Sequence, residues 1–181
     1  MFKNMRLFIA LTLPRLVKEE VLSYQKRIQG TLNDFSPVTF DNLHMTLAFL
    51  GETNDVETVK EALRSFSFNG PVSFTLDNTI AFSMRKYDTL VIRANECPLV
   101  LILDEKLRKL LDEHNIEYDK RNFVPHVTLG RGVSINLKDL DNFKVLSNIV
   151  VSSFSLFEST KDEEGNFIYR KNRRISVRRT T

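Results

Sequence analysis

The stretch that decides the fold is residues 123–131, which read Phe-Val-Pro-His-Val-Thr-Leu-Gly-Arg. Its tetrapeptide His-x-Thr-Leu occurs twice in the chain, at residues 44–47 and again at residues 126–129. The chain has three histidines, and two of them open these tetrapeptides. Because one copy lies in each half of the chain, we expect a scaffold that brings His44 and His126 to the two sides of one groove.

The first motif is predicted to lie on a strand whose two faces differ in polarity. Met45, Leu47 and Phe49 alternate with His44 and Thr46, and successive side chains of a strand point to opposite faces. The apolar set is expected to face the core. The imidazole and the hydroxyl then point together to the other side, about 6.5–7 Å apart along the backbone.

The remaining segments predict a mixed chain of helices and strands. Period-two alternation and turn residues indicate further strands at 6–13, 72–76, 79–82, 89–94, 124–129, 149–157 and 167–177, with a short extended piece at 37–40. Helical spacing indicates helices from Pro14 to Gly30, after a capping box at Asn54 and Glu57, and across 99–110, with a further helical segment at 137–143.

An internal repeat follows from this order. Strand, helix and motif strand succeed one another in the first half, and the same order recurs from residue 89. We therefore expect two α+β lobes of similar plan, related by a pseudo-two-fold axis and packed side by side. A chain of 181 residues fits a single domain of this kind, residues 1–181. A cleft between two lobes of one chain needs no partner, so a monomer is expected.

Composition favours a soluble protein of the cytoplasm. The chain is 42% hydrophobic and 27% charged with a net charge of +3, which is not by itself a sign of DNA binding. One cysteine, Cys97, makes no internal disulfide and suits a reducing compartment. The apolar run at 7–13 is too short for a signal peptide, and no run is long enough to span a membrane.

Basic residues gather toward the C-terminus. No acidic residue follows Tyr169, whereas six basic residues do: Arg170, Lys171, Arg173, Arg174, Arg178 and Arg179. Such a segment is either a landing surface for a polyanion or a solvated strand face, and both readings stay open.

Two His-x-Thr pairs that face each other supply an acid, a base and two hydroxyl donors. Imidazole titrates near neutral pH, and a threonine hydroxyl donates to an anionic oxygen. This set suits an in-line displacement at phosphorus, in which one histidine deprotonates the attacking oxygen and the other protonates the leaving oxygen. The chemistry needs no metal.

A structural role and a metal site are the other readings of these histidines. A lone histidine on a strand is more often structural, but a duplicate at matching places in two similar half-chains argues against that role. A metal site lacks a neighbouring carboxylate or a third histidine on the same face. His114 closes an apolar stripe and is assigned to packing or to a helix C-terminus.

The sequence resembles the two-histidine phosphoesterase superfamily, and within it the RNA 2′,3′-cyclic phosphodiesterase branch (LigT-like proteins, formerly called 2′-5′ RNA ligases). The resemblance rests on residues 5–10, 42–52 and 125–131, and on the final hairpin with Glu158, Ser159 and Tyr169. It covers essentially the whole chain. A single His-x-Thr would be weak support, but two copies with these flanks are specific.

The resemblance implies a bilobal α+β fold of two pseudo-symmetric lobes. Each lobe would have an antiparallel sheet with helices on its outer face, and the active-site cleft would lie between the sheets. The implied activity is hydrolysis of an RNA 2′,3′-cyclic phosphate end to a 2′-phosphate without a cofactor, with tRNA fragments as one candidate partner. His44 and His126 become the acid–base pair, and Thr46 and Thr128 the phosphate donors.

The resemblance implies roles for three further residues less directly. Arg131 falls where the family has an arginine after the second motif. Strict alternation would turn it away from His126, and a twist or bulge at Gly130 would redirect it. Arg6 and Phe8 lie on the free face of the first strand, where Arg6 would reach phosphate and Phe8 would either stack on a base or line the cleft wall.

Cleavage to a 2′-phosphate expels the 3′ oxygen. We favour His44 as the acid that protonates it and His126 as the base, although the sequence does not decide between them, and we expect a bell-shaped pH profile. The alternatives are a phosphoesterase that acts on a small cyclic nucleotide-type phosphate, and 2′-5′ RNA ligation by the reverse reaction. A non-catalytic RNA-binding module would need a broken motif, and neither motif is broken.

Overall fold

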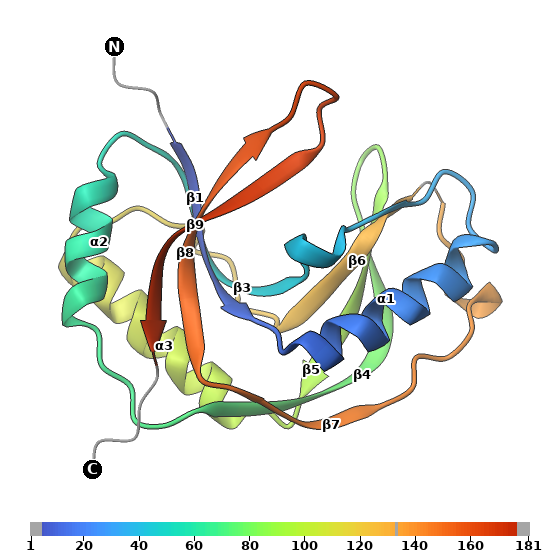
Figure 1. Ribbon diagram of the computed structural model, residues 1–181, viewed down its shortest axis with the longest axis horizontal. Helices are drawn as coiled ribbons and strands as arrows, with labels where there is room; N and C mark the ends of the chain where they lie inside the picture. The colour runs from blue at the N-terminus through green and yellow to red at the C-terminus, as the bar shows by residue number, and fades with distance from the viewer. Residues whose placement is uncertain (1–4, 133, 177–181) are drawn as a thin grey trace.

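A computed structural model describes residues 5–132 and 134–176 and contains two antiparallel sheets (Figure 1). The four-stranded sheet has the order β3-β1-β8-β9, from His44–Thr53, Met5–Thr12, Ser153–Lys161 and Phe167–Ser176. The five-stranded sheet has the order β2-β6-β5-β4-β7, from Ser36–Pro37, His126–Gly132, Asp88–Asn95, Val72–Ser83 and Leu146–Val151. The predicted α+β class with two antiparallel sheets is confirmed.

Three helices cover the sheets: α1 (Arg15–Gln29), α2 (Val56–Ser65) and α3 (Pro98–Glu113). Each of the two long helices contacts the sheet that does not contain the strand preceding it. α1 follows β1 of the four-stranded sheet and leads to β2 of the five-stranded sheet. Its Gln25 Nε2 donates to the carbonyls of Val38 and Leu129, beside and within the five-stranded sheet. α3 connects β5 to β6, yet it lies with α2 beside the four-stranded sheet (Figure 1), and the Asp119 amide after it donates to the Phe49 carbonyl on β3.

One continuous core results from this exchange of helices. Leu7, Ile9 and Leu11 of β1 are almost fully buried, as the alternation predicts. They belong to the same apolar cluster as Leu103 and Leu107 of α3. The two sheets are thereby held in a fixed relation, which positions the side chains of the strands that meet between them.

Several local predictions need correction. The N-cap of α2 is Asp55 and not Asn54, because the Asp55 carboxylate accepts from the Thr58 amide. β4 runs unbroken through the expected turn at residues 77–78, which a register shift absorbs. The strand predicted at 149–157 is two strands in different sheets, β7 and β8, which meet at Ser152.

Two short segments also differ from the prediction. The extended piece is β2, and a 3-10 turn (η1, Phe40–Asn42) follows it. The helical segment expected at 137–143 shortens to a 3-10 turn (η2, Leu137–Asp139). The expected end of the last strand at Val177 lies outside the described residues, as do Arg178 and Arg179 of the basic tail. None of the helices in the described part of the chain is both long and apolar enough to cross a membrane.

Candidate active site

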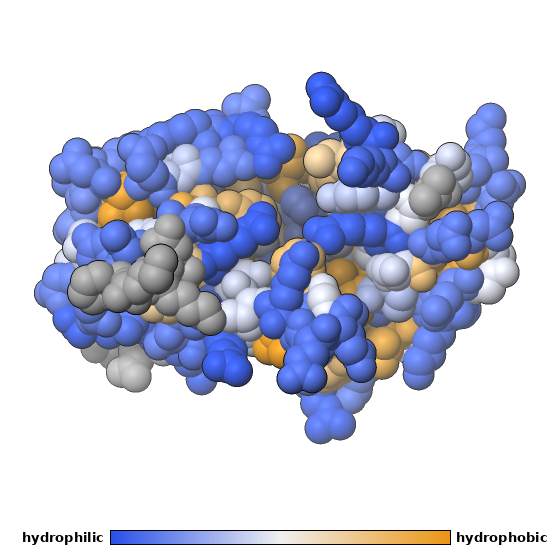
Figure 2. Space-filling model, turned by 90° about the horizontal axis from the view of Figure 1, so that it is seen from above, coloured by the Kyte–Doolittle hydropathy of each residue, from blue (hydrophilic) through white to orange (hydrophobic). Residues whose placement is uncertain are grey.

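The two motif strands lie against each other where the two sheets meet. β3 is the edge strand of the four-stranded sheet, β6 is the second strand of the other, and the two are in contact. His44 begins β3 and His126 begins β6. Seen from above, the surface is hollowed near its centre and is largely bordered by hydrophilic residues (Figure 2). The sheet topology therefore brings the two predicted histidines to one cleft.

Both imidazole rings are held by the same backbone device. His44 Nδ1 lies 2.6 Å from the Asn42 carbonyl oxygen, and His126 Nδ1 lies 2.6 Å from the Val124 carbonyl oxygen. A carbonyl only accepts, so Nδ1 carries a proton in each ring and Nε2 is the nitrogen left for proton exchange. In the neutral ring, His44 Nε2 accepts from Thr46 Oγ1 at 2.9 Å. Each motif thus presents one exchangeable nitrogen in a fixed orientation.

The His44 ring lies among aromatic side chains of the four-stranded sheet. Its centroid is 5.0 Å from that of Phe8, 6.4 Å from Phe157 and 5.3 Å from Tyr169. This burial lowers the pKa of His44 to about 4; the Asn42 carbonyl opposes the shift, and the charges of His126 and Lys18 add to it. His44 is therefore neutral in the free protein at pH 7.

The surroundings of His126 are milder. Phe82 of β4 packs edge-on against its ring at 5.3 Å between centroids. Burial lowers the pKa of His126 below its usual value, and the hydrogen bond to the Val124 carbonyl opposes that shift. Both rings are thus neutral at rest, and an anion bound between them would raise both pKa values.

A bulge in β6 decides where Arg131 points. Thr128 lies opposite Val91 on β5, and Arg131 lies opposite Thr89. Three steps along β6 therefore match two steps along β5, because Leu129 has no partner on β5. Val91 and Thr89 are two residues apart and share a face. Arg131 therefore lies on the same face as Thr128, which strict alternation would have forbidden. The bulge is at Leu129, one residue before the position at which the sequence suggested it.

The first motif contains the same bulge and places Phe49 in the cleft. Thr46 lies opposite Ala10 and Phe49 lies opposite Phe8, which leaves Leu47 as the extra residue. The expectation that Phe49 faces the core is wrong, because its side chain is 47% exposed. Sequence reasoning missed this residue. The signal was available, since Phe49 stands five residues after its histidine, as Arg131 does.

Arg131 joins the two sheets at the cleft. Its guanidinium lies 5.2 Å from the centroid of Tyr87 in the β4–β5 hairpin and 5.6 Å from that of Phe167 on β9. Gly130 allows the close approach of β2, because a Cβ there would lie 2.4 Å from the Ser36 carbonyl oxygen. The cation is therefore fixed by rings from both sheets and by a tight backbone crossing.

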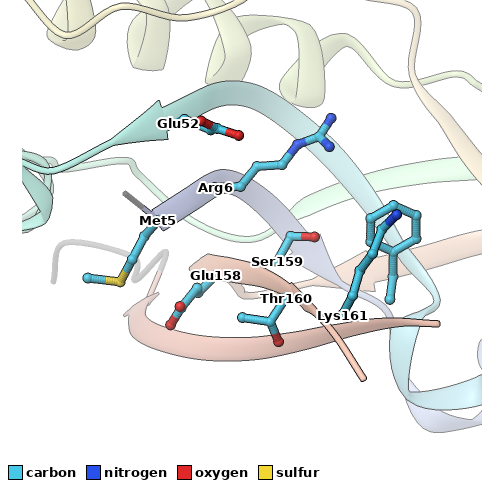
Figure 3. A pocket seen from close by; sticks show the side chains of 8 residues that line it. Met5, Arg6, Glu52, Glu158, Ser159, Thr160 and Lys161 are labelled. Atoms are coloured by element: carbon cyan, nitrogen blue, oxygen red, sulfur yellow. The ribbon is translucent and has the colours of Figure 1, made fainter. Parts of the chain in front are cut away.

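Phe8 and Arg6 lie on β1 and differ in their exposure to solvent. Phe8 is 3% exposed and packs on His44, Phe157 and Tyr169, so it lines the wall and offers no free face to a base. Arg6 is exposed and lines a pocket of about 270 Å³ at one end of the four-stranded sheet. There it lies between Glu52 of β3 and Ser159 of β8 (Figure 3).

The described side chains do not assemble a metal site. No three His, Cys, Asp or Glu residues gather into a metal-binding group anywhere in residues 5–132 and 134–176. His114 ends α3, and its Nδ1 contacts the Leu110 carbonyl, in keeping with the helix C-terminal role expected of it.

Comparison with known proteins identifies the family. Residues 14–140 match the family described as the 2′-5′ RNA ligase superfamily. The chain is 34% identical over 146 residues to a Methanocaldococcus jannaschii protein named RNA 2′,3′-cyclic phosphodiesterase, which covers 80% of this chain and 78% of that protein. An Escherichia coli protein of the same name is 30% identical over 135 residues, 74% of this chain and 76% of its own length.

Solved structures agree with this assignment. The crystal structure of E. coli LigT in apo form superposes with a TM-score of 0.75 at 26% identity, over 98% of this chain and 99% of that one. The chain belongs to the 2′-5′ RNA ligase superfamily. The resemblance indicated by the two motifs is confirmed.

Proposed function

We propose that this protein hydrolyses the 2′,3′-cyclic phosphate end of RNA to a 2′-phosphate without a metal or other cofactor. The observation that carries the proposal is the pair of imidazoles in one cleft, each with Nδ1 tied to the carbonyl two residues earlier and each followed by a threonine on the same face. The curated relatives that carry the name RNA 2′,3′-cyclic phosphodiesterase support the choice of substrate.

The reaction follows from the two Nε2 atoms. One neutral imidazole accepts a proton from water as the water oxygen attacks phosphorus. The bond from phosphorus to the 3′ oxygen breaks, and the other imidazole, protonated, donates its Nε2 proton to that oxygen. The Thr46 and Thr128 hydroxyls donate to the non-bridging oxygens, and the Arg131 guanidinium offsets their charge.

His44 is our candidate for the acid and His126 for the base. Burial lowers the pKa of His44 to about 4, so its protonated ring is a strong donor once the anionic phosphate has made protonation favourable. The pKa of His126 is lowered as well, but no facing charge adds to the effect of burial there. The more basic ring suits proton abstraction from water.

Aromatic and cationic groups beside the histidines would hold the terminal nucleotide. Phe49 is the exposed ring on the His44 strand, so it replaces the covered Phe8 as the candidate for base stacking. Arg6 remains a candidate for contact with substrate from its end of the cleft.

The proposal extends to the protein as a whole. Residues 1–181 would act as one domain and as a monomer, since the strands of both sheets and a shared core come from one chain. We place it in the cytoplasm, with tRNA fragments among the candidate RNAs. Light scattering during size-exclusion chromatography tests the monomer.

Phosphorus NMR tests the reaction. A short RNA with a 2′,3′-cyclic phosphate end is incubated with the purified protein in EDTA, and we expect a 2′-monophosphate. His44→Ala and His126→Ala should each abolish conversion. His114→Ala is the matched control and should retain it, because that histidine lies exposed at the end of α3.

The products separate the alternatives. A 3′-monophosphate would keep the acid–base pair but reverse the leaving oxygen. Conversion of cyclic mononucleotides alone would indicate a small-molecule phosphoesterase, and joining of added 5′-hydroxyl RNA through a 2′-5′ bond would indicate the reverse reaction. An unchanged cyclic phosphate in the folded protein would refute the proposal.

A further inference from the structure

A second pocket lies on the four-stranded sheet beyond His44. Its volume is about 250 Å³. The described residues that line it come from the end of β1, the β7–β8 junction and β9: Thr12, Pro14, Val150, Val151, Ser152, Ser153, Lys171 and Arg174. Two of these are cations, and none is acidic. The pocket uses the basic segment that the sequence singled out and that the catalytic chemistry leaves unassigned.

This pocket lies on the same face of the sheet as the catalytic histidine. Thr12 is opposite His44 in the β1–β3 ladder. Lys171 is opposite Phe157 on β8, and its Nζ lies 5.9 Å from the centroid of the Phe157 ring, which in turn neighbours the His44 ring. Arg174 lies opposite Ser155, beyond the point at which the pairing of β8 with β9 shifts register. A chain that lies on this face can therefore pass from His44 to the two cations without leaving the sheet.

Lys18 of α1 connects the two regions electrostatically. Its Nζ donates to the Asp41 carbonyl at 3.4 Å, beside the first motif. Burial lowers the pKa of Lys18, the Asp41 charge raises it, and the charge of Lys171 lowers it further. The charge of Lys18 also acts on His44. Like charges repel one another, and an anion bound between Lys18 and Lys171 would relieve that repulsion.

The opposite end of the sheet has a different character. The pocket around Arg6 includes the carboxylates of Glu52 and Glu158 together with Lys161 (Figure 3). A polyanion would meet both signs of charge there. At the Lys171 end, the charged side chains among the described lining residues are both cations.

We propose that Lys18, Lys171 and Arg174 form a subsite for a backbone phosphate of the RNA, upstream of the cyclic end. The inference rests on the proposed function and narrows it: the substrate is an oligonucleotide, and a nucleoside 2′,3′-cyclic phosphate fills only part of the site. The RNA chain leaves the catalytic cleft along β9 toward Arg174. Phosphate contacts of this kind position a nucleic acid without reading its sequence.

A substrate series tests the subsite. The kcat/KM is measured at fixed ionic strength for a nucleoside 2′,3′-cyclic phosphate, the same compound with a 5′-phosphate, and cyclic-ended di- and trinucleotides. We expect a rise of about tenfold at the first member whose added phosphate reaches the cations, as one charge-assisted hydrogen bond supports. Lys171→Ala and Arg174→Ala should remove this rise and leave turnover of the cyclic mononucleoside unchanged.

Arg170→Ala is the matched control. It removes the same charge from the neighbouring position of β9, but Arg170 lies opposite Glu158, on the other face of the strand. This variant should retain the rise. The subsite would be refuted if kcat/KM did not rise along the series, or if it still rose in the double variant Lys171→Ala, Arg174→Ala. Neither result would contradict the hydrolysis itself.

A binding measurement on inactive protein tests the subsite independently of catalysis. The same series, ending in the 2′-phosphate product, is titrated calorimetrically into protein that carries His44→Ala and His126→Ala. We expect the affinity to rise at the same member of the series and to lose that rise in Lys171→Ala. If no substrate is hydrolysed, the proposed function fails, and this titration still supports or refutes the subsite.

Discussion

The pKa of His44 should control how the stability of the fold responds to acid. In the unfolded chain the imidazole accepts a proton near pH 6.5, whereas burial in the folded protein lowers the pKa to about 4. Between these values the unfolded state binds a proton that the folded state does not. His44 therefore costs no stability above about pH 6.5, and acid removes stability progressively down to about pH 4.

The size of the effect follows from the two pKa values. The gap between 6.5 and about 4 corresponds to about 3 kcal/mol of unfolding free energy, all of which is lost below the lower value. At about pH 5 the unfolded imidazole is almost fully protonated and the folded one is mostly neutral, so roughly 2 kcal/mol has gone. This is a large share of the stability of a typical domain.

Urea denaturation of wild type and His44→Gln isolates this contribution. Glutamine cannot take a proton, while the carboxylates and the other histidines titrate in both proteins. Between about pH 7.5 and pH 5 we expect the wild type to lose about 2 kcal/mol more than the variant. Equal losses, or an NMR titration of His44 with a midpoint near the unperturbed value, would refute the reasoning about its burial.

Three further expectations concern the site and its supports. The pH profile of kcat/KM should be bell-shaped with its maximum below about pH 6.5, because both resting pKa values are lowered; a flat profile from about pH 5 to pH 9 would contradict acid–base catalysis. Gly130→Ala should destabilise the protein by about 1–3 kcal/mol in urea denaturation and lower kcat/KM, since its Cβ would lie 2.4 Å from the Ser36 carbonyl oxygen. Gly30→Ala meets no atom within 4 Å and should be tolerated. Phe8→Leu should lower stability by about 1–2 kcal/mol and kcat more than KM, because the ring supports His44; unchanged kcat would show that this support is dispensable.

The motif strands were predictable because their signals are local. His44 and Thr46 share a face by alternation alone, and the second copy repeats the pattern, so the paired imidazoles could be placed in one groove. The α+β class followed in the same way from the periods of the segments. Each strand assignment depends on residues within a few positions of one another, and the shared groove follows from the recurrence of the motif in the two halves of the chain.

The exchange of helices was not predictable from local patterns. The stripe of α1 shows which face is buried, but it does not show against which sheet. That choice depends on polar contacts that are distant in sequence, such as the Gln25 amide on the Leu129 carbonyl and the Tyr24 hydroxyl on the Asp141 carbonyl. The split of residues 149–157 between two sheets escaped detection for the same reason.

The bulges explain why the alternation of side chains along a strand gave the correct orientation for the two threonines and the wrong one two residues later. In each motif the leucine is the extra residue and stays buried, Leu47 at 2% and Leu129 at 0% exposure. The residue after it is also buried, so two consecutive side chains face inward, and there the chain has Ala48 and Gly130. At Gly130 the residue must be small because a Cβ would lie 2.4 Å from the Ser36 carbonyl oxygen. The next residue is thereby returned to the cleft, as an aromatic ring on one side and a guanidinium on the other. One backbone plan, used twice, thus presents a histidine and a threonine on the same face in each half, followed by an aromatic ring in one half and a guanidinium in the other. In the proposed function, this difference would let a nearly symmetric cleft bind an asymmetric nucleotide.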